Sequence, residues 1–227
     1  MNEMPWTPDL GEYETVLDER GIADLLGAIS ALAGTPGDIV ECGSWRGGSA
    51  MIMGEFLRRT GDERLVYACD SYEGFDLDEL RLERESGRTR ERDDAFASTS
   101  LKYVQAKIRE RDLEGKVRPV KGYFEETLPT LEGPFALALV DCDLHSSILY
   151  AACALWPKLS AGGMMLFDDY LNAEHFSGAR AAVEQFLADH RDEIEDERLL
   201  SRLYRVRKAR GATRVGALDT GASTAGA

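Results

Sequence analysis

The segment GDIVECGSWRGGSA, residues 37–50, decides the fold of this chain because it contains a complete transition from strand to turn to helix. Its residues 39–42 form a short apolar run that suits a buried strand. A glycine-rich turn follows, and residues 49–61 then have helical spacing and end in a glycine. The segment therefore predicts one β–α unit with a tight loop at the carboxyl end of its strand.

The same alternation of strand and helix extends along the chain on both sides of this unit. Further apolar runs that suit strands lie at residues 64–70, 116–122, 135–141 and 163–169. Further segments with helical spacing lie at residues 21–34, 98–113, 146–163 and 178–194. This pattern predicts an α/β fold with a doubly wound, mainly parallel sheet and helices on both faces. The alternating side chains of RLYRVRK, residues 202–208, predict an additional strand at one edge.

A length of 227 residues suits one domain. We expect this domain to span residues 1–208 and to begin with a helical extension at residues 1–36. Residues 73–98, called here the lid segment, are densely charged and interrupt the alternation. Because the lid segment has few apolar residues to bury, we expect it to be mobile until ligands bind. Residues 209–227 are small and polar, and we expect a disordered tail there.

Charge and hydropathy argue against several classes of partner. The formal net charge of −14 and the pI near 4.7 oppose a nucleic-acid partner, which normally needs a basic face. No apolar run approaches the roughly 20 residues of a membrane span, and the N-terminus lacks the basic-then-apolar order of a signal peptide. We therefore expect a cytoplasmic protein without a nucleic-acid or membrane partner. The four cysteines form no C-x-x-C pair and are predicted to be reduced thiols.

The glycine loop indicates which ligand the sheet could hold. Its glycines follow the spacing G-x-x-x-G-G, whereas a dinucleotide fingerprint is G-x-G-x-x-G, and the bulk of Trp45 would oppose a pyrophosphate. Glu41, just before the loop, suits the ammonium group of an amino acid, and Asp70, at the end of the second strand, suits ribose hydroxyls. An adenosine that carries an amino acid is S-adenosylmethionine. The alternative is that the glycines serve only a tight turn.

Acidic residues end two apolar runs, in LALVDCDLHSS (residues 137–147) and GGMMLFDDY (residues 162–170). The two strands are neighbours in a doubly wound sheet, so we expect Asp141, Asp168 and Asp169 to meet at one edge. No lysine or arginine stands beside either run, and close carboxylates repel unless a cation lies between them. An all-oxygen ligand set favours Mg²⁺. The alternative is that these aspartates only accept hydrogen bonds from local backbone amides.

Six blocks of the sequence resemble one known family, the macrocin O-methyltransferases, which use S-adenosylmethionine to methylate sugar hydroxyls on macrolides and related natural products. The resemblance covers about residues 21–187 and is carried by GDIVECGSWRGGSA, CDSYEGF, KGYFEETLP, LVDCDLHSS, LWPKLSAGGMMLFDDY and GARAAVEQF. It implies a Rossmann-like class I methyltransferase fold and a magnesium site at Asp141, Asp168 and Asp169. It implies a cofactor site made of Glu41, Cys42, Gly43, Ser49, Asp70, Ser71, Gly122, Phe124 and Asp141.

The chain departs from the family pattern close to the expected active site. Where the family has Asp-Gly-Asp-Leu-Tyr, this chain has Cys142 for the glycine and His145 for the tyrosine. The segment RLYRVRK also departs from the family's usual tyrosine-tryptophan ending. The arginines of the lid segment do not specify an acceptor; they include Arg81, Arg84, Arg88, Arg90 and Arg92.

The chemistry of a sugar hydroxyl defines what such a site must supply. The hydroxyl is too weakly acidic to ionise at neutral pH, so methyl transfer needs a cation that stabilises the alkoxide and a base within reach. We predict Asp141 as base and metal ligand. His145 is the second candidate base, because imidazole titrates near neutrality, and its alternative is a structural role at a helix start. The expected partner is a small-molecule sugar or glycoside.

Two other functions fit the same sequence. One is a magnesium-dependent methyltransferase of the catechol type, which an acceptor panel would distinguish because its substrate is a flat phenol. The other is a cofactor-binding subunit without catalysis, which would bind the cofactor but turn over no hydroxylated glycoside. The sequence leaves open whether the chain forms a homo-oligomer.

Overall fold

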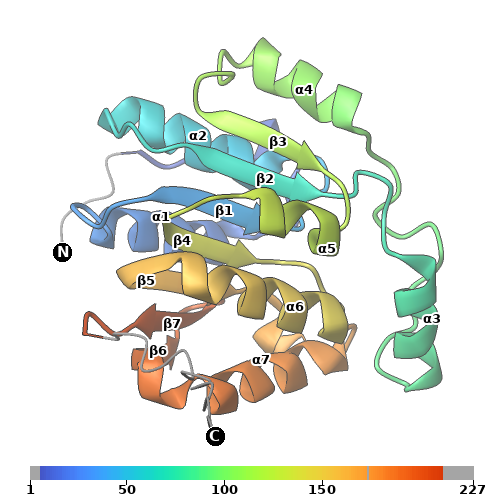
Figure 1. Cartoon of the computed structure of the whole chain (residues 1–227). Coiled ribbons are helices and arrows are strands. Elements are labelled where there is room, and N and C mark those ends of the chain that lie inside the picture. The colour runs from blue at the N-terminus through green and yellow to red at the C-terminus, as the bar shows by residue number, and fades with distance from the viewer. Residues whose placement is uncertain (1–5, 173, 212–227) are drawn as a thin grey trace, which may run out of the picture.

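A computed structural model of the chain describes residues 6–172 and 174–211. Its centre is a seven-stranded sheet with the order β3-β2-β1-β4-β5-β7-β6 (Figure 1). The strands are β1 (Asp38–Cys42), β2 (Val66–Asp70), β3 (Val117–Lys121), β4 (Phe135–Val140), β5 (Leu159–Phe167), β6 (Ile194–Leu199) and β7 (Tyr204–Lys208). Strands β1 to β5 pair in parallel, and β7 is antiparallel to both of its neighbours. The predicted α/β fold with a mainly parallel sheet is confirmed.

Helices cover both faces of this sheet, as predicted (Figure 1). They are α1 (Glu19–Ala31), α2 (Gly48–Thr60), α3 (Leu77–Glu85), α4 (Leu101–Glu110), α5 (Phe124–Thr127), α6 (His145–Leu155) and α7 (Ser177–Asp189). Strand β4 is buried on both sides: Leu137 and Leu139 join the core under α1, α2 and α4, whereas Ala138 and Val140 join the core under α6 and α7. A doubly buried strand explains the continuous apolar run in the sequence.

The edge of the sheet differs from the prediction. RLYRVRK contains β7, as expected, but β7 lies inside the sheet, between β5 and β6. The edge strand is β6, with the sequence IEDERL, which carries mostly half-buried and exposed side chains. Since an edge strand that faces water needs no apolar alternation, its charged sequence gave no strand signal.

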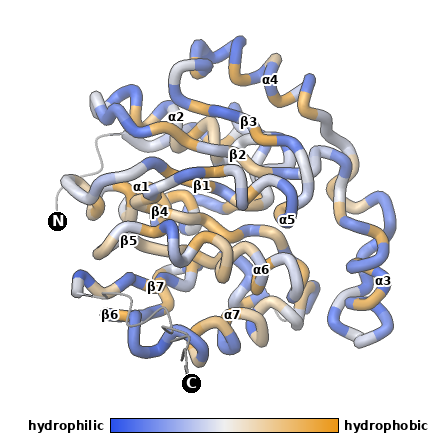
Figure 2. The backbone as a smooth tube through the Cα atoms, viewed as in Figure 1, coloured by the Kyte–Doolittle hydropathy of each residue, from blue (hydrophilic) through white to orange (hydrophobic). Residues whose placement is uncertain are grey.

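The lid segment is partly helical, which the sequence analysis did not predict. It contains the helix α3, whose first amides are capped by the side chain of Asp76. Although α3 is largely hydrophilic (Figure 2), its Leu80 and Glu83 are buried. These two side chains, one helical turn apart, dock α3 on the rest of the domain. The mobility of the lid segment without ligands stays a prediction.

The chain ends agree with the expected domain only in part. In the N-terminal extension, α1 contributes Leu25 and Ile29 to the core, so this helix is an integral part of the domain. The helix predicted for residues 146–163 ends at Leu155, because Pro157 follows and β5 begins at Leu159. Most of the tail expected to be disordered, residues 212–227, lies outside the described residues. Among the described helices, none has the length and apolar character to cross a membrane.

Candidate active site

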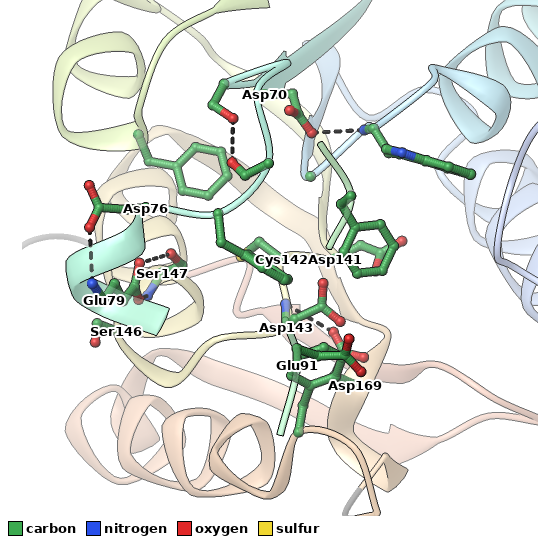
Figure 3. A pocket seen from close by; sticks show the side chains of 18 of the residues that line it. Asp70, Asp76, Glu79, Glu91, Asp141, Cys142, Asp143, Ser146, Ser147 and Asp169 are labelled. Carbon is green, nitrogen blue, oxygen red and sulfur yellow. Dashed lines mark hydrogen bonds between the residues drawn. The ribbon is translucent and has the colours of Figure 1, made fainter. Parts of the chain in front are cut away.

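A cavity of about 690 Å³ opens at the carboxyl ends of the parallel strands. The glycine loop after β1, the ends of β2, β4 and β5, and the lid segment all contribute to its wall (Figure 3). The residues predicted from the sequence that line this cavity are Gly43, Asp70, Ser71, Gly122, Phe124, Asp141, Asp168 and Asp169. The predicted residues Glu41, Cys42, Ser49 and His145 do not line it.

Gly43 explains why the loop after β1 needs a glycine. Its φ is +89°, and a Cβ atom there would lie 1.7 Å from the carbonyl oxygen of Asp141. The two loops are also joined by the Asp141 amide, which donates to the carbonyl of Cys42 at 2.9 Å. Any side chain at position 43 would therefore push the end of β1 away from the end of β4. The glycine loop and Asp141 form one rigid junction.

Asp70 connects two loops that line the cavity. Its carboxylate accepts hydrogen bonds from the amides of Trp45 at 2.8 Å and Tyr72 at 2.6 Å. Both donors have positive φ, 46° for Trp45 and 54° for Tyr72, a strained conformation that these hydrogen bonds help to hold. Burial raises the pKa of Asp70, while the two amides oppose this shift. Asp70 lines the cavity, where its carboxylate can accept a hydrogen bond from a ligand hydroxyl.

Glu41 is a buried carboxylate with no partner. It is fully buried in β1, and neither of its oxygens makes a hydrogen bond of ordinary geometry within the described residues. Burial raises its pKa to about 8, although the nearby Ser49 hydroxyl lowers it. Cys42 and Ser49 are buried beside it, behind the cavity wall. An unpartnered carboxylate next to Gly43 is a site where a ligand cation would be stabilised.

The ends of β2 and β3 form another part of the cavity wall, on the side where the cofactor is expected. The Gly122 amide donates to the carbonyl of Asp70 at 3.0 Å, which holds the two strand ends together. The Ser71 hydroxyl donates to the carbonyl of Gly74 at 2.6 Å and so fixes the turn that leads into the lid segment. Phe124, half-buried at the start of α5, adds an aromatic face to this wall.

Asp141, Asp168 and Asp169 meet at the edge of the sheet, as their positions at two neighbouring strand ends predict. One carboxylate oxygen from each lies within 4.8 Å of the others. Burial, then Asp168, then Asp169 raise the pKa of Asp141 well above its ordinary value. Burial and Asp168 raise the pKa of Asp169 to about 7. Three crowded carboxylates form a set of hard oxygen ligands suited to a divalent cation.

Arg202 is a partner for Asp168 that the sequence analysis missed. Its Nε and one terminal nitrogen each donate to a different oxygen of Asp168 at 2.7 Å, in the bidentate arrangement typical of arginine. The pair is 34 residues apart in the chain. The antiparallel register explains the contact: Phe167 pairs with Tyr204, so residues after β5 lie beside residues before β7. The sequence analysis expected no lysine or arginine beside these carboxylates, and this expectation is wrong for Asp168.

Asp143 is a fourth acidic residue of this cluster that the sequence analysis did not select. Its φ is +64°, and its amide donates to Asp169 at 3.2 Å (Figure 3). Burial and the neighbouring Asp169 raise its pKa well above the ordinary value. The residue order Asp-Cys-Asp in the sequence is the signal that could have indicated it. Asp143 fixes the orientation of Asp169 through its backbone.

Removal of the Arg202 side chain tests the charge balance of the cluster. We expect Arg202→Gln to lower the free energy of unfolding by about 2 kcal/mol, because the buried carboxylate of Asp168 loses its cation. The partial exposure of Arg202 limits the size of this effect. Urea unfolding measures this change, and Arg198→Gln on the exposed edge strand is the control. Added Mg²⁺ should restore part of the lost stability. Equal stability of both variants would show that the ion pair contributes nothing.

His145 lies away from the cavity. It is the first residue of α6, and its Cβ is near Gly178 at the start of α7. Burial, and then the positive charge of Arg88, lower its pKa, whereas Glu83 raises it. This position favours the structural role at a helix start over the role of a base.

Glu79 attaches the lid segment to the helix that follows Asp141. Its carboxylate accepts hydrogen bonds from the Ser147 amide and from the Ser147 hydroxyl, both at 2.7 Å. Leu144, at the N-cap of α6, has no polar side chain that could accept from the free amides of the first helical turn. Glu79 therefore caps α6 from another element. The Ser177 amide at the start of α7 donates to the carbonyl of Arg88 in the same segment. The lid segment is therefore held at the N-termini of two helices.

We expect Glu79→Ala to expose the lid segment to protease. The loss of a cap should lower the free energy of unfolding by about 1 kcal/mol, with a larger effect on the local opening of residues 73–98. Limited proteolysis followed by mass spectrometry measures cleavage in this segment. Glu85→Ala is the matched control, since Glu85 is exposed on the same helix. The same cleavage rate in both variants would contradict the attachment.

Comparison with known proteins identifies the family of the chain. The family model for macrocin-O-methyltransferase (TylF) matches residues 14–197. Over 143 residues the chain is 39% identical to the 8-demethyl-8-(2,3-dimethoxy-alpha-L-rhamnosyl)-tetracenomycin-C 4'-O-methyltransferase of Streptomyces olivaceus, a match that covers 60% of this chain and 54% of the relative. Over 140 residues it is 34% identical to the demethyldecarbamoylnovobiocin O-methyltransferase of Streptomyces niveus, covering 60% of this chain and 53% of the relative.

The solved structures include a close match to the whole fold. The O-methyltransferase NovP superposes with a TM-score of 0.72 at 25% identity, and the match covers 86% of this chain and 82% of that one. The chain spans about half the length of the two curated relatives, 54% and 53%. Because the family model matches most of its residues, from before α1 into β6, the chain belongs to the macrocin-O-methyltransferase (TylF) family.

Proposed function

We propose that this chain is an S-adenosylmethionine-dependent O-methyltransferase that methylates a hydroxyl of a sugar or glycosylated natural product. The observation that carries the proposal is the rigid junction between the glycine loop and Asp141, because it holds one member of the acidic cluster, the half-buried carboxylate of Asp141, beside the loop where the cofactor is expected. The names of the two curated relatives support the reaction class, since both are O-methyltransferases of natural products.

The cofactor side of the cavity fits S-adenosylmethionine. Asp70 lines the cavity and suits the ribose hydroxyls. Glu41 lies buried behind the cavity wall, two residues before Gly43, and its charge suits the ammonium group of the methionine part. Gly122, Ser71 and Phe124 form the wall where an adenine ring would lie. A pyrophosphate has no comparable place, because acidic residues and Trp45 surround the loop.

The acidic cluster fits magnesium as the second cofactor. Asp141, Asp168 and Asp169 supply three oxygen ligands, and Asp168 can add a metal contact to its pair with Arg202 because each oxygen has two lone pairs. When bound, Mg²⁺ would stabilise the negative charge that develops on the acceptor oxygen.

Asp141 supplies the base in the proposed mechanism. Its carboxylate lines the cavity at the end of β4, so it can take the proton from the acceptor hydroxyl as the oxygen attacks. The methyl group passes from the sulfonium sulfur to this oxygen, and the products are S-adenosylhomocysteine, the methyl ether and a proton. The rigid glycine loop and Asp141 hold the two reactants in line, which is the main requirement of a direct transfer.

Cofactor binding tests the proposal. S-Adenosylmethionine and S-adenosylhomocysteine should bind in a calorimetric titration, and NAD should not. Asp70→Ala should weaken binding by about 10- to 100-fold, the loss of a charge-assisted hydrogen bond. Asp78→Ala is the control, because Asp78 is exposed on α3 and outside the cavity. Tight NAD binding without a response to S-adenosylmethionine would overturn the proposal.

A further inference from the structure

An N-terminal strap, residues 6–18, runs beside the cavity and is attached to the elements around it. Glu14 of the strap accepts a hydrogen bond at 2.5 Å from Arg46, which belongs to the glycine loop. Leu17 is buried in the hydrophobic core. Between these two anchors, Val16 lines the cavity and is 53% exposed. A movement of the strap would therefore change the cavity wall.

Gly48, the first residue of α2, lets the strap lie directly against the end of the glycine loop. A Cβ atom at this position would lie 2.8 Å from the amide nitrogen of Thr15 and would also collide with the carbonyl of Glu14. No side chain fits there unless the strap moves. The second of the two adjacent glycines therefore serves the contact with the strap.

Arg202 joins the strap to the acidic cluster. Its Nε and Nη2 donate to the two oxygens of Asp168, and its Nη1 donates to the carbonyl of Val16 at 3.3 Å. The same Nη1 lies 3.6 Å from the carboxylate of Asp18, the last residue of the strap. One planar guanidinium therefore contacts a predicted metal ligand on one side and the strap on the other.

The position of Arg202 is fixed by Asp24 of α1. One oxygen of the Asp24 carboxylate accepts from the hydroxyl and the amide of Ser201, at 2.6 and 3.3 Å. The other oxygen accepts from the amides of Arg202 and Leu203, at 2.7 and 3.1 Å. Gly21, one turn earlier in α1, leaves room for the arginine, since a Cβ atom there would lie 3.1 Å from its Cδ. The fold thus holds this guanidinium between the cluster and the strap.

The contacts of Arg202 with the strap are longer than its contacts with the cluster. The two hydrogen bonds to Asp168 are 2.7 Å long, whereas the distances to Val16 and Asp18 exceed the roughly 2.9 Å of an ordinary N–H···O bond. A divalent cation at the cluster would share the charge of Asp168 and repel the guanidinium. The guanidinium can then move toward the strap, where both contacts can shorten.

We infer that Arg202 is a positioning residue that couples the acidic cluster to the N-terminal strap, so that a divalent cation at the cluster draws the strap more tightly against the cavity. This inference rests on the metal site of the proposed function. Because coupling between two sites is reciprocal, a tighter strap also strengthens the binding of the cation. Val16 then closes its part of the wall when the metal needed for the reaction is in place.

Hydrogen exchange of the strap, followed by mass spectrometry, tests the coupling. We expect Mg²⁺ to slow amide exchange in residues 12–18 of the wild-type protein by about fivefold or more. In Arg202→Lys the charge is kept, but a single ammonium group cannot hold both oxygens of Asp168 and the strap, so Mg²⁺ should leave this exchange unchanged. Arg20→Gln is the matched control and should keep the wild-type response, because Arg20 pairs with Asp18 from the exposed face of α1.

The affinity for Mg²⁺ tests the same coupling from the other side. Asp18→Asn keeps a side chain that can cap α1 but removes the charge that attracts Arg202 toward the strap. Although Asp18 does not line the cavity, this variant should bind Mg²⁺ about threefold or more weakly in a calorimetric titration. Glu19→Gln removes an equal charge from the next, exposed residue and should leave the affinity unchanged.

The outcomes separate this inference from the proposed function. Mg²⁺ that binds without slowing exchange in the strap overturns the inference and leaves the proposed function standing. An undiminished response in Arg202→Lys, or equal Mg²⁺ affinities of the Asp18 and Glu19 variants, would show that Arg202 only stabilises the fold and also overturns it. If protein that binds S-adenosylhomocysteine does not bind Mg²⁺, the proposed metal site is wrong and the inference fails with it.

Discussion

Asp141→Asn is expected to lower kcat for methyl transfer by about 10²- to 10⁴-fold, the contribution of a positioned general base. The substitution keeps the size of the side chain but removes its ability to accept the hydroxyl proton. Because the contacts of Asp141 with the glycine loop are made by its backbone, the loop should keep its shape. Single-turnover kinetics measure kcat, and calorimetry should find the affinity for S-adenosylhomocysteine nearly unchanged.

His145→Gln is the control for this prediction. The structure places His145 against α7 and outside the cavity wall, so this variant should keep the wild-type pH–rate profile and lose only some stability. A changed pH–rate profile in the His145 variant, together with substantial activity in the Asp141 variant, would assign the base to the imidazole. The two single variants together therefore distinguish the candidate bases.

The parts of the fold that could be predicted are those whose signal is local. Gly43 marks the turn after β1 because only a glycine fits against the carbonyl of Asp141, and this requirement appears in the sequence as a glycine after an apolar run. The buried strands β4 and β5 are continuous apolar runs for the same local reason. By contrast, β6 is an edge strand with solvated side chains, and its sequence carries no such pattern.

The parts of the site that escaped prediction depend on pairing between distant segments. Asp168 and Arg202 meet only because β7 runs antiparallel beside β5, and no feature near either residue indicates this strand order. Glu79 likewise caps a helix 68 residues further along the chain. The contacts of the lid segment also escaped prediction, because a count of charged residues cannot tell which of them are buried and hydrogen-bonded. Analysis of the sequence alone therefore misses mainly the electrostatic contacts between distant segments of the chain.

Removal of divalent metal is also expected to have a large effect on the rate of methyl transfer. Treatment with a chelator should abolish methyl transfer, whereas the affinity for S-adenosylhomocysteine should change by less than about threefold, because the acidic cluster lies on the acceptor side. Asp169→Asn removes one ligand charge and should lose activity that high Mg²⁺ partly restores. Asp168→Asn should recover less, since it also deprives Arg202 of its bidentate partner. Isothermal titration with Mg²⁺ measures each affinity directly.

The pH dependence of stability in the metal-free protein tests the acidic cluster independently of activity. The pKa of Asp169 is raised to about 7 in the folded protein, whereas the carboxyl of an unfolded chain titrates near 3.9. Between these values the folded state binds more protons than the unfolded state, so stability should fall as pH rises from about 4 to 7. Mg²⁺ should remove this dependence because it binds the ionised carboxylates. Full activity in chelator, together with a melting temperature that Mg²⁺ does not change at pH 8, would show that the carboxylates of this cluster do not bind a metal and act without one.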